Sequence, residues 1–432
     1  MNRVAFLGID LGTSGCRGIA IDENGQILAQ SHTALPAPIH QQQSIEQAPE
    51  LWWQAVEQVF ADILIQLADR PLVSIAVDGT SGTLLLSDEN GQPLTMGLMY
   101  NDARATTESA QITAIAPNDT AASGPSSALA KLLWLQQHGP QQASFALHQA
   151  DWVANRLCGK FGLSDTNNCM KLGYDAQRNS WPDWLDELGV ERRLLPKVLA
   201  PGTVMGQLSP QLAKHYGLLH RVNIIAGTTD STAAIYASGA SRPGDAITSL
   251  GSTLVTKVIA EAPIFNAEHG VYSQPFGPYW LVGGASNSGG NVLLKYFSRQ
   301  QLQQMTPQLQ AEQSTGLDYY PLSVPGERFP LNEPNYPPRL IPRPESDIVY
   351  FQAMLEGIAE IEKQAYELLH RLGAPYPKRI ISLGGGAKNS AWTTIRRNKL
   401  SLEVVTATQT EAAYGAALLA RQQQDQNAQR RK

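Results

Sequence analysis

The hydrophobic and polar positions of the chain follow two periodicities in turn, which predicts strands that alternate with helices. Apolar residues 4–9 lead to Asp10, and a second apolar run at residues 16–21 follows a Gly-Thr-Ser-Gly turn. This order predicts a hairpin with glycines at its tip. Between residues 45 and 67 the apolar residues recur at helical spacing, and residues 73–77 predict another strand. The opening of the chain is therefore typical of an α/β protein.

The middle of the chain continues this alternation and then repeats its opening. Helical spacing at residues 128–137 and 151–157 precedes a strand at residues 222–226. Residues 246–257 then read as strand, small-residue turn and strand, as residues 6–17 do. This echo predicts a duplicated lobe.

The last part of the chain contains a loop, a helix and a strand. Residues 319–345 are rich in proline and predict a long ordered loop. A helix is expected at residues 349–372, where Gly373 ends it, and a strand at residues 379–383 runs into successive glycines. Residues 422–432 are polar and glutamine-rich, so we expect a frayed tail.

Length, charge and cysteine content exclude several classes of protein. A chain of 432 residues is long enough for two or three domains with a cleft between lobes. The 33 basic and 38 acidic residues give a net charge of -5 without a basic stripe, which argues against a nucleic-acid partner. Cys16, Cys158 and Cys169 are too scattered for a disulfide framework. With no long apolar run or leader, we expect a cytoplasmic protein with no membrane partner.

Four predicted strands end in glycine-rich or small-residue turns, which is the feature that points most directly to chemistry. Glycine lets the backbone approach an anion and direct several N–H groups at it, and nearby hydroxyl groups add donors. Each turn alone fits a tight hairpin or a helix cap equally well, but four together favour phosphate binding. The chain lacks the P-loop pattern and has no dinucleotide fingerprint after its first strand. The turns are residues 10–15, 227–230, 251–253 and 384–389.

Two aspartates are suitably placed for phosphoryl transfer. This reaction needs a metal to gather phosphate charge and a carboxylate to orient and deprotonate the attacking hydroxyl. Asp10 ends the first strand, where it can reach Mg²⁺ directly or through water. Asp230 starts a predicted helix, where an N-cap is the plainer interpretation. Asp10 and Asp78 can also be simple turn residues.

Trp392 and Asn389 are candidates for contact with a flat base. The tryptophan could stack on the base and the amide could bond to it, although a tryptophan near a helix start is more often part of the core.

Several stretches of the chain resemble motifs of the FGGY family of carbohydrate kinases. They occur in the same order as in the family and extend over nearly the whole chain. The resemblance implies two ribonuclease-H-like lobes of the actin-like ATPase type. The expected N-terminal lobe, residues 1–238, binds sugar and carries the catalytic base; the C-terminal lobe, residues 239–421, binds ATP. The stretches are Gly8 to Ser14, Ile45 to Trp53, Ala130 to Leu135, Gly227 to Asp230, Pro243 to Thr253, Gly326 to Pro330 and Gly384 to Asn389.

The resemblance also implies a role for individual residues, with ATP and Mg²⁺ as cofactors. Asp230 would be the catalytic base. The other implied contacts are Asp10, Thr13 and Ser14 for metal and phosphate; Gly251, Ser252 and Thr253 for the ATP phosphates; Gly385, Gly386, Asn389 and Trp392 for adenosine; and Asp10, Thr80, Ser81 and Asp230 for the sugar.

The turn after the strand at residues 73–77 bears on the choice of sugar. Bacterial xylulose kinases usually carry Gly-Gln-Met-His-Gly where this chain has residues 78–82, so the Met-His pair is absent. An Asp-x-Thr-Ser turn and the short chain resemble compact cyanobacterial and plant pentulose kinases that act on D-ribulose. We therefore favour D-ribulose, which would give D-ribulose 5-phosphate. D-xylulose, another polyol, or an actin-like ATPase switch without a sugar substrate are the alternatives.

Overall fold

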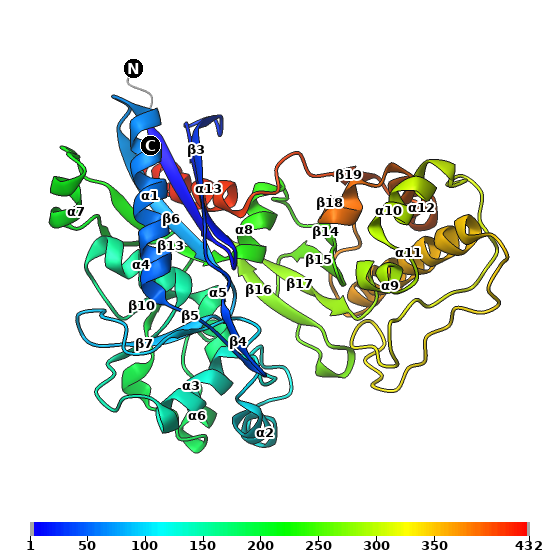
Figure 1. The fold of residues 1–432 in the computed structure, drawn as a ribbon, viewed down its shortest axis with the longest axis horizontal. Helices are drawn as coiled ribbons and strands as arrows, with labels where there is room; N and C mark the ends of the chain where they lie inside the picture. Colours follow the sequence, from blue (N-terminus) through cyan, green and yellow to red (C-terminus); the bar gives the residue numbers. More distant parts are fainter. Residues whose placement is uncertain (1–3, 430–432) are drawn as a thin grey trace. The chain divides into compact units, whose positions relative to one another are not determined.

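The computed structural model describes residues 4–429, which form two compact α/β units (Figure 1). Unit 1 holds the chain up to Ala237 and again from Gln409 onward, and unit 2 holds Ser238–Thr408.

Unit 1 is built on a mixed sheet in the order β12-β13-β6-β1-β2-β3. Strands β13, β6 and β1 run parallel to one another, and β2 and β3 continue from β1 as antiparallel neighbours. The strands of this unit are β1 Ala5–Leu11, β2 Gly15–Ile21, β3 Ile27–Ala34, β4 Ile39–Gln41, β5 Ser44–Gln47, β6 Leu72–Gly79, β7 Leu84–Ser87, β8 Gly97–Leu98, β9 Phe145–His148, β10 Leu163–Asp165, β11 Lys197–Leu199, β12 Val204–Gln207 and β13 Asn223–Thr229.

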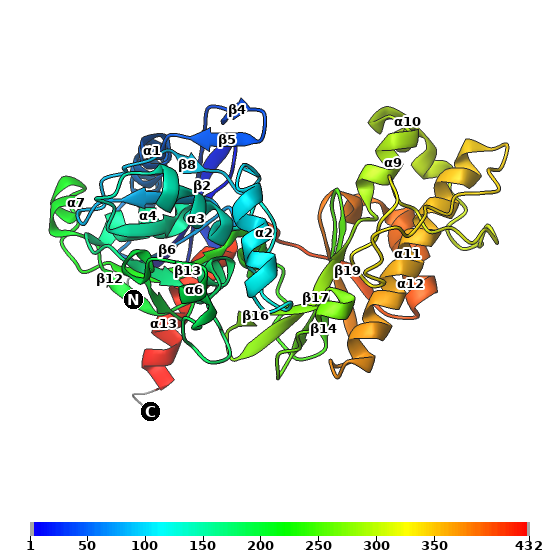
Figure 2. The same ribbon diagram turned by 90° about the horizontal axis from the view of Figure 1, so that it is seen from below.

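Helices cover both faces of this sheet. Helices α1 and α4 pack on one face, where Leu7, Ile9 and Val59 belong to one buried cluster. Helix α13 covers the other face, as Figure 2 shows. The helices are α1 Pro49–Leu67, α2 Thr106–Ile115, α3 Ala128–His138, α4 Gln149–Cys158, α5 Thr166–Cys169, α6 Trp184–Glu187, α7 Pro210–His215, α8 Asp230–Ala237 and α13 Ala412–Gln429, with 3-10 turns η1 Met170–Leu172 and η2 Arg192–Leu194.

Unit 2 repeats this topology. Its sheet has the order β16-β17-β15-β14-β18-β19, in which β14, β18 and β19 are parallel and β15 and β17 are antiparallel neighbours. The elements are β14 Asp245–Leu250, β15 Leu254–Ala260, β16 Tyr272–Phe276, β17 Tyr279–Ser286, β18 Arg379–Leu383, β19 Val404–Thr406, α9 Gly290–Tyr296, α10 Arg299–Met305, α11 Asp347–Arg371 and α12 Ser390–Leu400, with 3-10 turns η3 Ala267–His269, η4 Thr306–Gln308 and η5 Gly385–Lys388.

A buried ion pair ties the helices of unit 2 to its sheet. Arg396 of α12 donates to Glu362 of α11 at 2.6 Å, and both side chains are fully buried. Arg396 also donates to Ser382 of β18, and Glu362 accepts from Thr248 of β14. Removing one member of such a pair costs about 3–5 kcal/mol because the other charge is left unpaired. The network therefore fixes the two strands whose ends carry the glycine turns of this unit.

The predicted alternation, the duplicated lobe and the α/β class are confirmed. Both sheets have the same order and directions around their first strands, β1 and β14. The loop at residues 319–345 is long and irregular, and α11 ends at Arg371, two residues before Gly373, which has a positive φ of 105°.

Two predicted boundaries are wrong. Residues 44–47 form β5 rather than the start of a helix, because Pro49 sits at the first turn and α1 begins there. The strand predicted at residues 222–226 continues through Gly227 to Thr229. A Cβ on Gly227 would lie 1.7 Å from the carbonyl oxygen of Val77, so glycine allows β13 to stay against β6.

The end of the chain packs within unit 1. Residues 409–421 belong to unit 1, because α13 packs on β1, β6 and α8. The hydroxyl of Ser74 in β6 donates to the carbonyl of Ala420 at 2.7 Å, and Tyr414 donates to Gly25 at 2.9 Å. Of the expected polar tail, residues 422–429 continue α13, and residues 430–432 lie outside the described residues.

Candidate active site

Three aspartates lie together at the carboxyl ends of neighbouring strands in unit 1. Asp10 of β1 pairs in register with Asp78 of β6, and Thr228 of β13 pairs with Asp78 from the other side. Asp230 follows two residues later and begins α8. The parallel order β13-β6-β1 therefore gathers side chains that are far apart in sequence.

Asp78 is the central member of this group. Its side chain is fully buried, and neither carboxylate oxygen accepts a hydrogen bond. Burial raises its pKa well above the usual value, and the charges of Asp10 and Asp230 raise that pKa further. Burial also raises the pKa of Asp10, but a protonated Asp78 donating to it and the nearby Arg17 act in the opposite direction. The pair favours a neutral Asp78 beside an ionised Asp10.

Asp230 is poised to exchange a proton near neutral pH. Burial raises its pKa to about 6, and the charge of Asp10 adds to this effect. The backbone N–H of Ser231 donates to Asp230 Oδ1 at 2.6 Å and limits the rise. Asp230 is the first residue of α8, and its bond from the next residue is not the predicted N-cap bond, which would come from the second or third helical N–H. A carboxylate with a pKa near the operating pH is suited to general base catalysis.

The hairpin turn beside Asp10 has the predicted glycine-rich form. The N–H of Gly12 donates to the carbonyl of Gly15 at 3.0 Å and closes the turn between β1 and β2. Thr13 is half-buried and Ser14 is exposed at its tip. The two hydroxyls therefore belong to residues three and four positions after Asp10, at the same end of β1.

The turn after β6 is held in place by hydrogen bonds to Gln149 and Lys131. The N–H and the hydroxyl of Thr80 both donate to Gln149 Oε1, at 3.1 and 2.8 Å, and Thr80 also bonds to Thr83. Lys131 donates from Nζ to the carbonyls of Gly82 and Met99, and its burial lowers its pKa to about 7. The Thr80 hydroxyl is thus engaged in holding the turn.

Besides the Asp78 oxygens, buried polar atoms near this turn have no partner among the described residues, among them Ser81 Oγ and Gln149 Nε2. Unpaired buried polar atoms are costly and rare, so they mark a place where a polar ligand can bind. Sequence reasoning named Ser81 but missed Gln149, because a single glutamine at a helix start carries no pattern.

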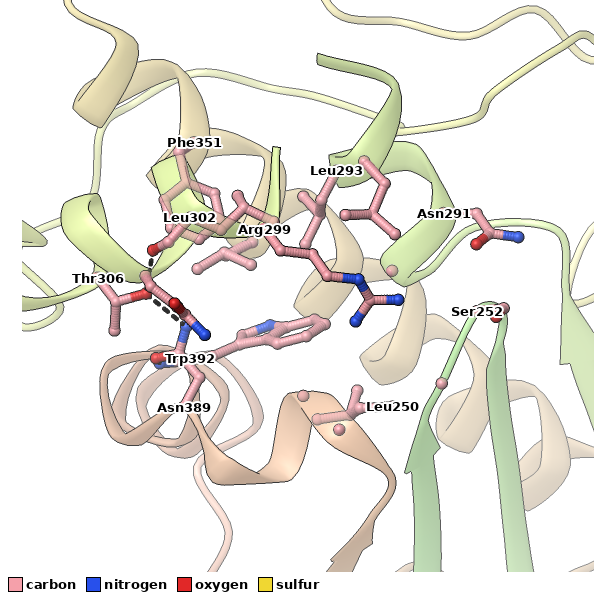
Figure 3. Close-up of a pocket in the computed structure, with 17 residues that line it drawn as sticks. Leu250, Ser252, Asn291, Leu293, Arg299, Leu302, Thr306, Phe351, Asn389 and Trp392 are labelled. Carbon is pink, nitrogen blue, oxygen red and sulfur yellow. Dashed lines mark hydrogen bonds between the residues drawn. The ribbon is translucent and has the colours of Figure 1, made fainter. Parts of the chain in front are cut away.

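Unit 2 contains a cavity of about 440 Å³ (Figure 3). It opens between the turn after β14, helices α9 and α10, one side of α11, and the glycine turn that leads into α12. Its lining residues are Leu250, Gly251, Ser252, Gly290, Asn291, Leu293, Leu294, Arg299, Leu302, Gln303, Thr306, Phe351, Leu355, Gly385, Gly386, Asn389 and Trp392.

Six of the seven residues predicted for ATP line this one cavity. Thr253 is the exception. Trp392 is only 3% exposed and lies against Gly386, while its Nε1 has no hydrogen-bond partner. Asn389 Oδ1 accepts from the N–H of Trp392 at 3.0 Å and caps α12, and its Nδ2 donates to Thr306. The tryptophan is thus both a core residue and a wall of the cavity.

Sequence reasoning missed the side of the cavity that α10 provides. Arg299, Leu302 and Gln303 come from a seven-residue helix whose capping box marks a helix start but no ligand site. No signal in the sequence connects this helix with the glycine turns.

Between residues 4 and 429 no three His, Cys, Asp or Glu side chains are grouped to hold a metal ion. Within the same range no helix is both long and apolar enough to cross a membrane.

Comparison with known proteins decides the family. The N-terminal domain of the FGGY family of carbohydrate kinases matches residues 5–237, and its C-terminal domain matches residues 246–422. The chain belongs to the FGGY family of carbohydrate kinases. The expected ribonuclease-H-like, actin-like kinase fold is confirmed.

The FGGY relatives match along nearly their whole length. The xylulose kinase of Escherichia coli (strain K12) is 25% identical, over 96% of this chain and 89% of its own. The xylulose kinase of Lactococcus lactis subsp. lactis (strain IL1403) is 26% identical, over 96% of this chain and 87% of its own. The crystal structure of a xyloylose kinase from Brucella ovis matches with a TM-score of 0.87 and 22% identity, over 98% of this chain and 91% of its own.

Proposed function

We propose that this FGGY kinase transfers the terminal phosphate of ATP to a hydroxyl of a pentulose, with D-ribulose as the preferred substrate and D-ribulose 5-phosphate as the product. The observation that carries the proposal is the position of Asp230. It lies at the carboxyl end of β13 beside Asp10 and Asp78, with its pKa raised to about 6, in a chain of a carbohydrate kinase family. A base of this kind is what an unreactive sugar hydroxyl requires.

The residues of unit 1 would divide the work of the transfer. Asp230 would take the proton of the attacking sugar hydroxyl. Thr13 and Ser14, at the tip of the β1–β2 turn, would donate hydrogen bonds to the moving phosphate. Ser81 would bond to a sugar hydroxyl, which would give its buried oxygen a partner. Thr80 supports the same turn through Gln149.

The residues of unit 2 would hold the nucleotide. Gly251, Ser252 and Thr253 would bind the phosphates at the end of β14. Gly385, Gly386 and Asn389 would contact the adenosine, with Trp392 as the wall of its pocket. A cavity of about 440 Å³ with an apolar floor suits a purine and a ribose.

Asp10 fits the role of a Mg²⁺ ligand. Mg²⁺ is commonly held by one or two carboxylates together with phosphates and water, so it needs no cluster of protein ligands. Asp10 would hold the ion directly or through its water, and the neutral Asp78 would support the Asp10 carboxylate from the side. When bound, Mg²⁺ would neutralise charge on the phosphates.

The preference for D-ribulose rests on the turn at residues 78–82. This turn has small side chains in place of the Met-His pair usual in xylulose kinases, and its Asp-x-Thr-Ser sequence resembles ribulose kinases. The relatives named above are xylulose kinases at about a quarter identity, so D-xylulose is the alternative substrate.

ADP production by the purified protein tests this proposal. The assay contains ATP and Mg²⁺ with D-ribulose, D-xylulose, L-ribulose, ribitol or glycerol, and a reaction without sugar as the control. We expect the highest kcat/KM with D-ribulose. A higher value with D-xylulose would overturn the sugar preference and leave the kinase. Equal ADP release with and without sugar would overturn the kinase and favour an ATPase switch.

A further inference from the structure

Arg299 is the one charged residue among the 17 residues that line the cavity of unit 2. Figure 3 shows its side chain extending into the cavity, with the guanidinium between the indole of Trp392 and Ser252 in this view. The positive charge therefore stands between the residues expected for adenosine and the turn expected for phosphates.

The position of Arg299 is set by the helix that it begins. Ser298 and Gln301 form a capping box at the start of α10. Arg299, Leu302 and Gln303 are spaced by three and four residues, so they share the face of α10 that lines the cavity. Leu302 packs against the buried cluster around Phe351, which anchors this face.

The charge of Arg299 is unpaired within the part of the chain that the structure describes. Among the interactions of residues 4–429, it donates no side-chain hydrogen bond and forms no ion pair, whereas Arg379 and Arg396 pair with carboxylates. The guanidinium fork matches the geometry of phosphate oxygens, and a charge-assisted bond of this kind is stronger than a neutral one. An unpaired arginine aimed into a cavity without acidic residues suits an anionic ligand.

We propose that Arg299 binds the phosphate chain of the nucleotide and makes this cavity prefer nucleoside di- and triphosphates over the nucleoside. This assignment rests on the proposed function of the cavity. In it, the charge of Arg299 adds to the N–H and hydroxyl of Ser252, while the apolar floor and Trp392 receive the base. Gln303, on the same helix face, carries no charge and serves as the matched control.

Calorimetric affinities for ADP and for adenosine test the assignment in the full-length protein. Arg299→Ala should weaken ADP binding about tenfold, as expected for loss of one exposed charge-assisted contact, and change adenosine binding less than twofold. Arg299→Lys should recover part of the ADP affinity. Gln303→Ala should change both ligands by the same factor. Arg371→Ala, at an exposed arginine on another cavity, should leave both affinities unchanged.

Two results would overturn the assignment while the proposed function stands. They are wild-type binding of ADP that Arg299→Ala leaves unchanged, and an equal loss of ADP and adenosine, which indicates contact with the base or loss of packing. A wild-type protein that binds neither ADP nor ATP would overturn the nucleotide role of the cavity, and with it this assignment. Circular dichroism of each variant establishes that the fold is retained.

Discussion

At the scale of single residues, similar carboxyl groups acquire different properties from their surroundings. Asp78 is enclosed without a hydrogen-bond donor, so burial favours its neutral form. Asp230 keeps the N–H of Ser231 as a donor, and its pKa rises only to about 6. The same sheet edge thus supplies a neutral carboxyl group and a base that is charged at neutral pH.

The raised pKa of Asp230 predicts how activity depends on pH. A base works only when it is deprotonated, so kcat/KM for the sugar should fall tenfold per pH unit as the pH drops below about 6. An ordinary aspartate would remain active to about pH 4. The measurement is a pH–rate profile from pH 5 to 8 with saturating ATP and Mg²⁺. A profile that is flat down to pH 5 would contradict this role for Asp230.

The sequence predicted only part of the candidate site. Asp10 and Asp230 could be found because each lies at the carboxyl end of a buried strand, and parallel strands place these ends at one edge of a sheet. Gln149 and Arg299 could not be found, since their contributions depend on how helices pack against those strand ends. The engagement of the Thr80 hydroxyl by Gln149 is likewise a tertiary contact that no local pattern encodes.

At the scale of elements, the positions of the strands were easier to predict than the surfaces against which the helices pack. The runs of β1, β6 and β14 are almost entirely buried, so their identity as strands follows from the sequence. The apolar face of α13 consists mostly of alanines. Such a face indicates close packing, but the sequence does not show against which element the helix packs. Its packing on β1 depends on Gly8, which has no side chain to separate the two elements.

This contact predicts the effect of a single methyl group. A Cβ on Gly8 would lie 1.9 Å from the carbonyl oxygen of Ala413 and 2.3 Å from the backbone N of Ala417. Gly8→Ala should therefore push α13 away from β1 and lower the free energy of unfolding by about 1–3 kcal/mol. Chemical denaturation followed by circular dichroism measures the loss.

Gly12→Ala is the matched control for this change. A Cβ at Gly12 meets its nearest atom, the Gly15 carbonyl oxygen, at 3.4 Å, so its stability should stay near the wild-type value. Equal stability of Gly8→Ala and the wild-type protein would show that α13 does not depend on this close approach.

At the scale of the whole molecule, the same sheet topology occurs in both units, but the residues at the strand ends differ. In unit 1 the strand ends carry acids, and in unit 2 the corresponding ends of β14 and β18 border an apolar cavity. The sequence echo between residues 6–17 and 246–257 predicted this duplication. The packing of α13 in unit 1 was not predicted. It is a contact between segments that are far apart in sequence, and no local pattern encodes it.

The division of labour between the units separates catalysis from nucleotide binding. If Asp230 is the base and the cavity of unit 2 binds the nucleotide, a change at Asp230 should lower the rate of phosphate transfer and leave nucleotide binding intact. General base catalysis contributes about 10² to 10⁴ in rate.

The most direct test of the account compares Asp230→Asn with the wild-type protein in two assays. The first is sugar-dependent ADP release with ATP, Mg²⁺ and D-ribulose, and the second is calorimetric ADP affinity. We predict that the variant loses about 10²-fold or more of the sugar-dependent rate while its ADP affinity stays within about twofold of the wild-type value. A variant that keeps the wild-type rate, or one that loses ADP affinity in step with the rate, would contradict Asp230 as the catalytic base.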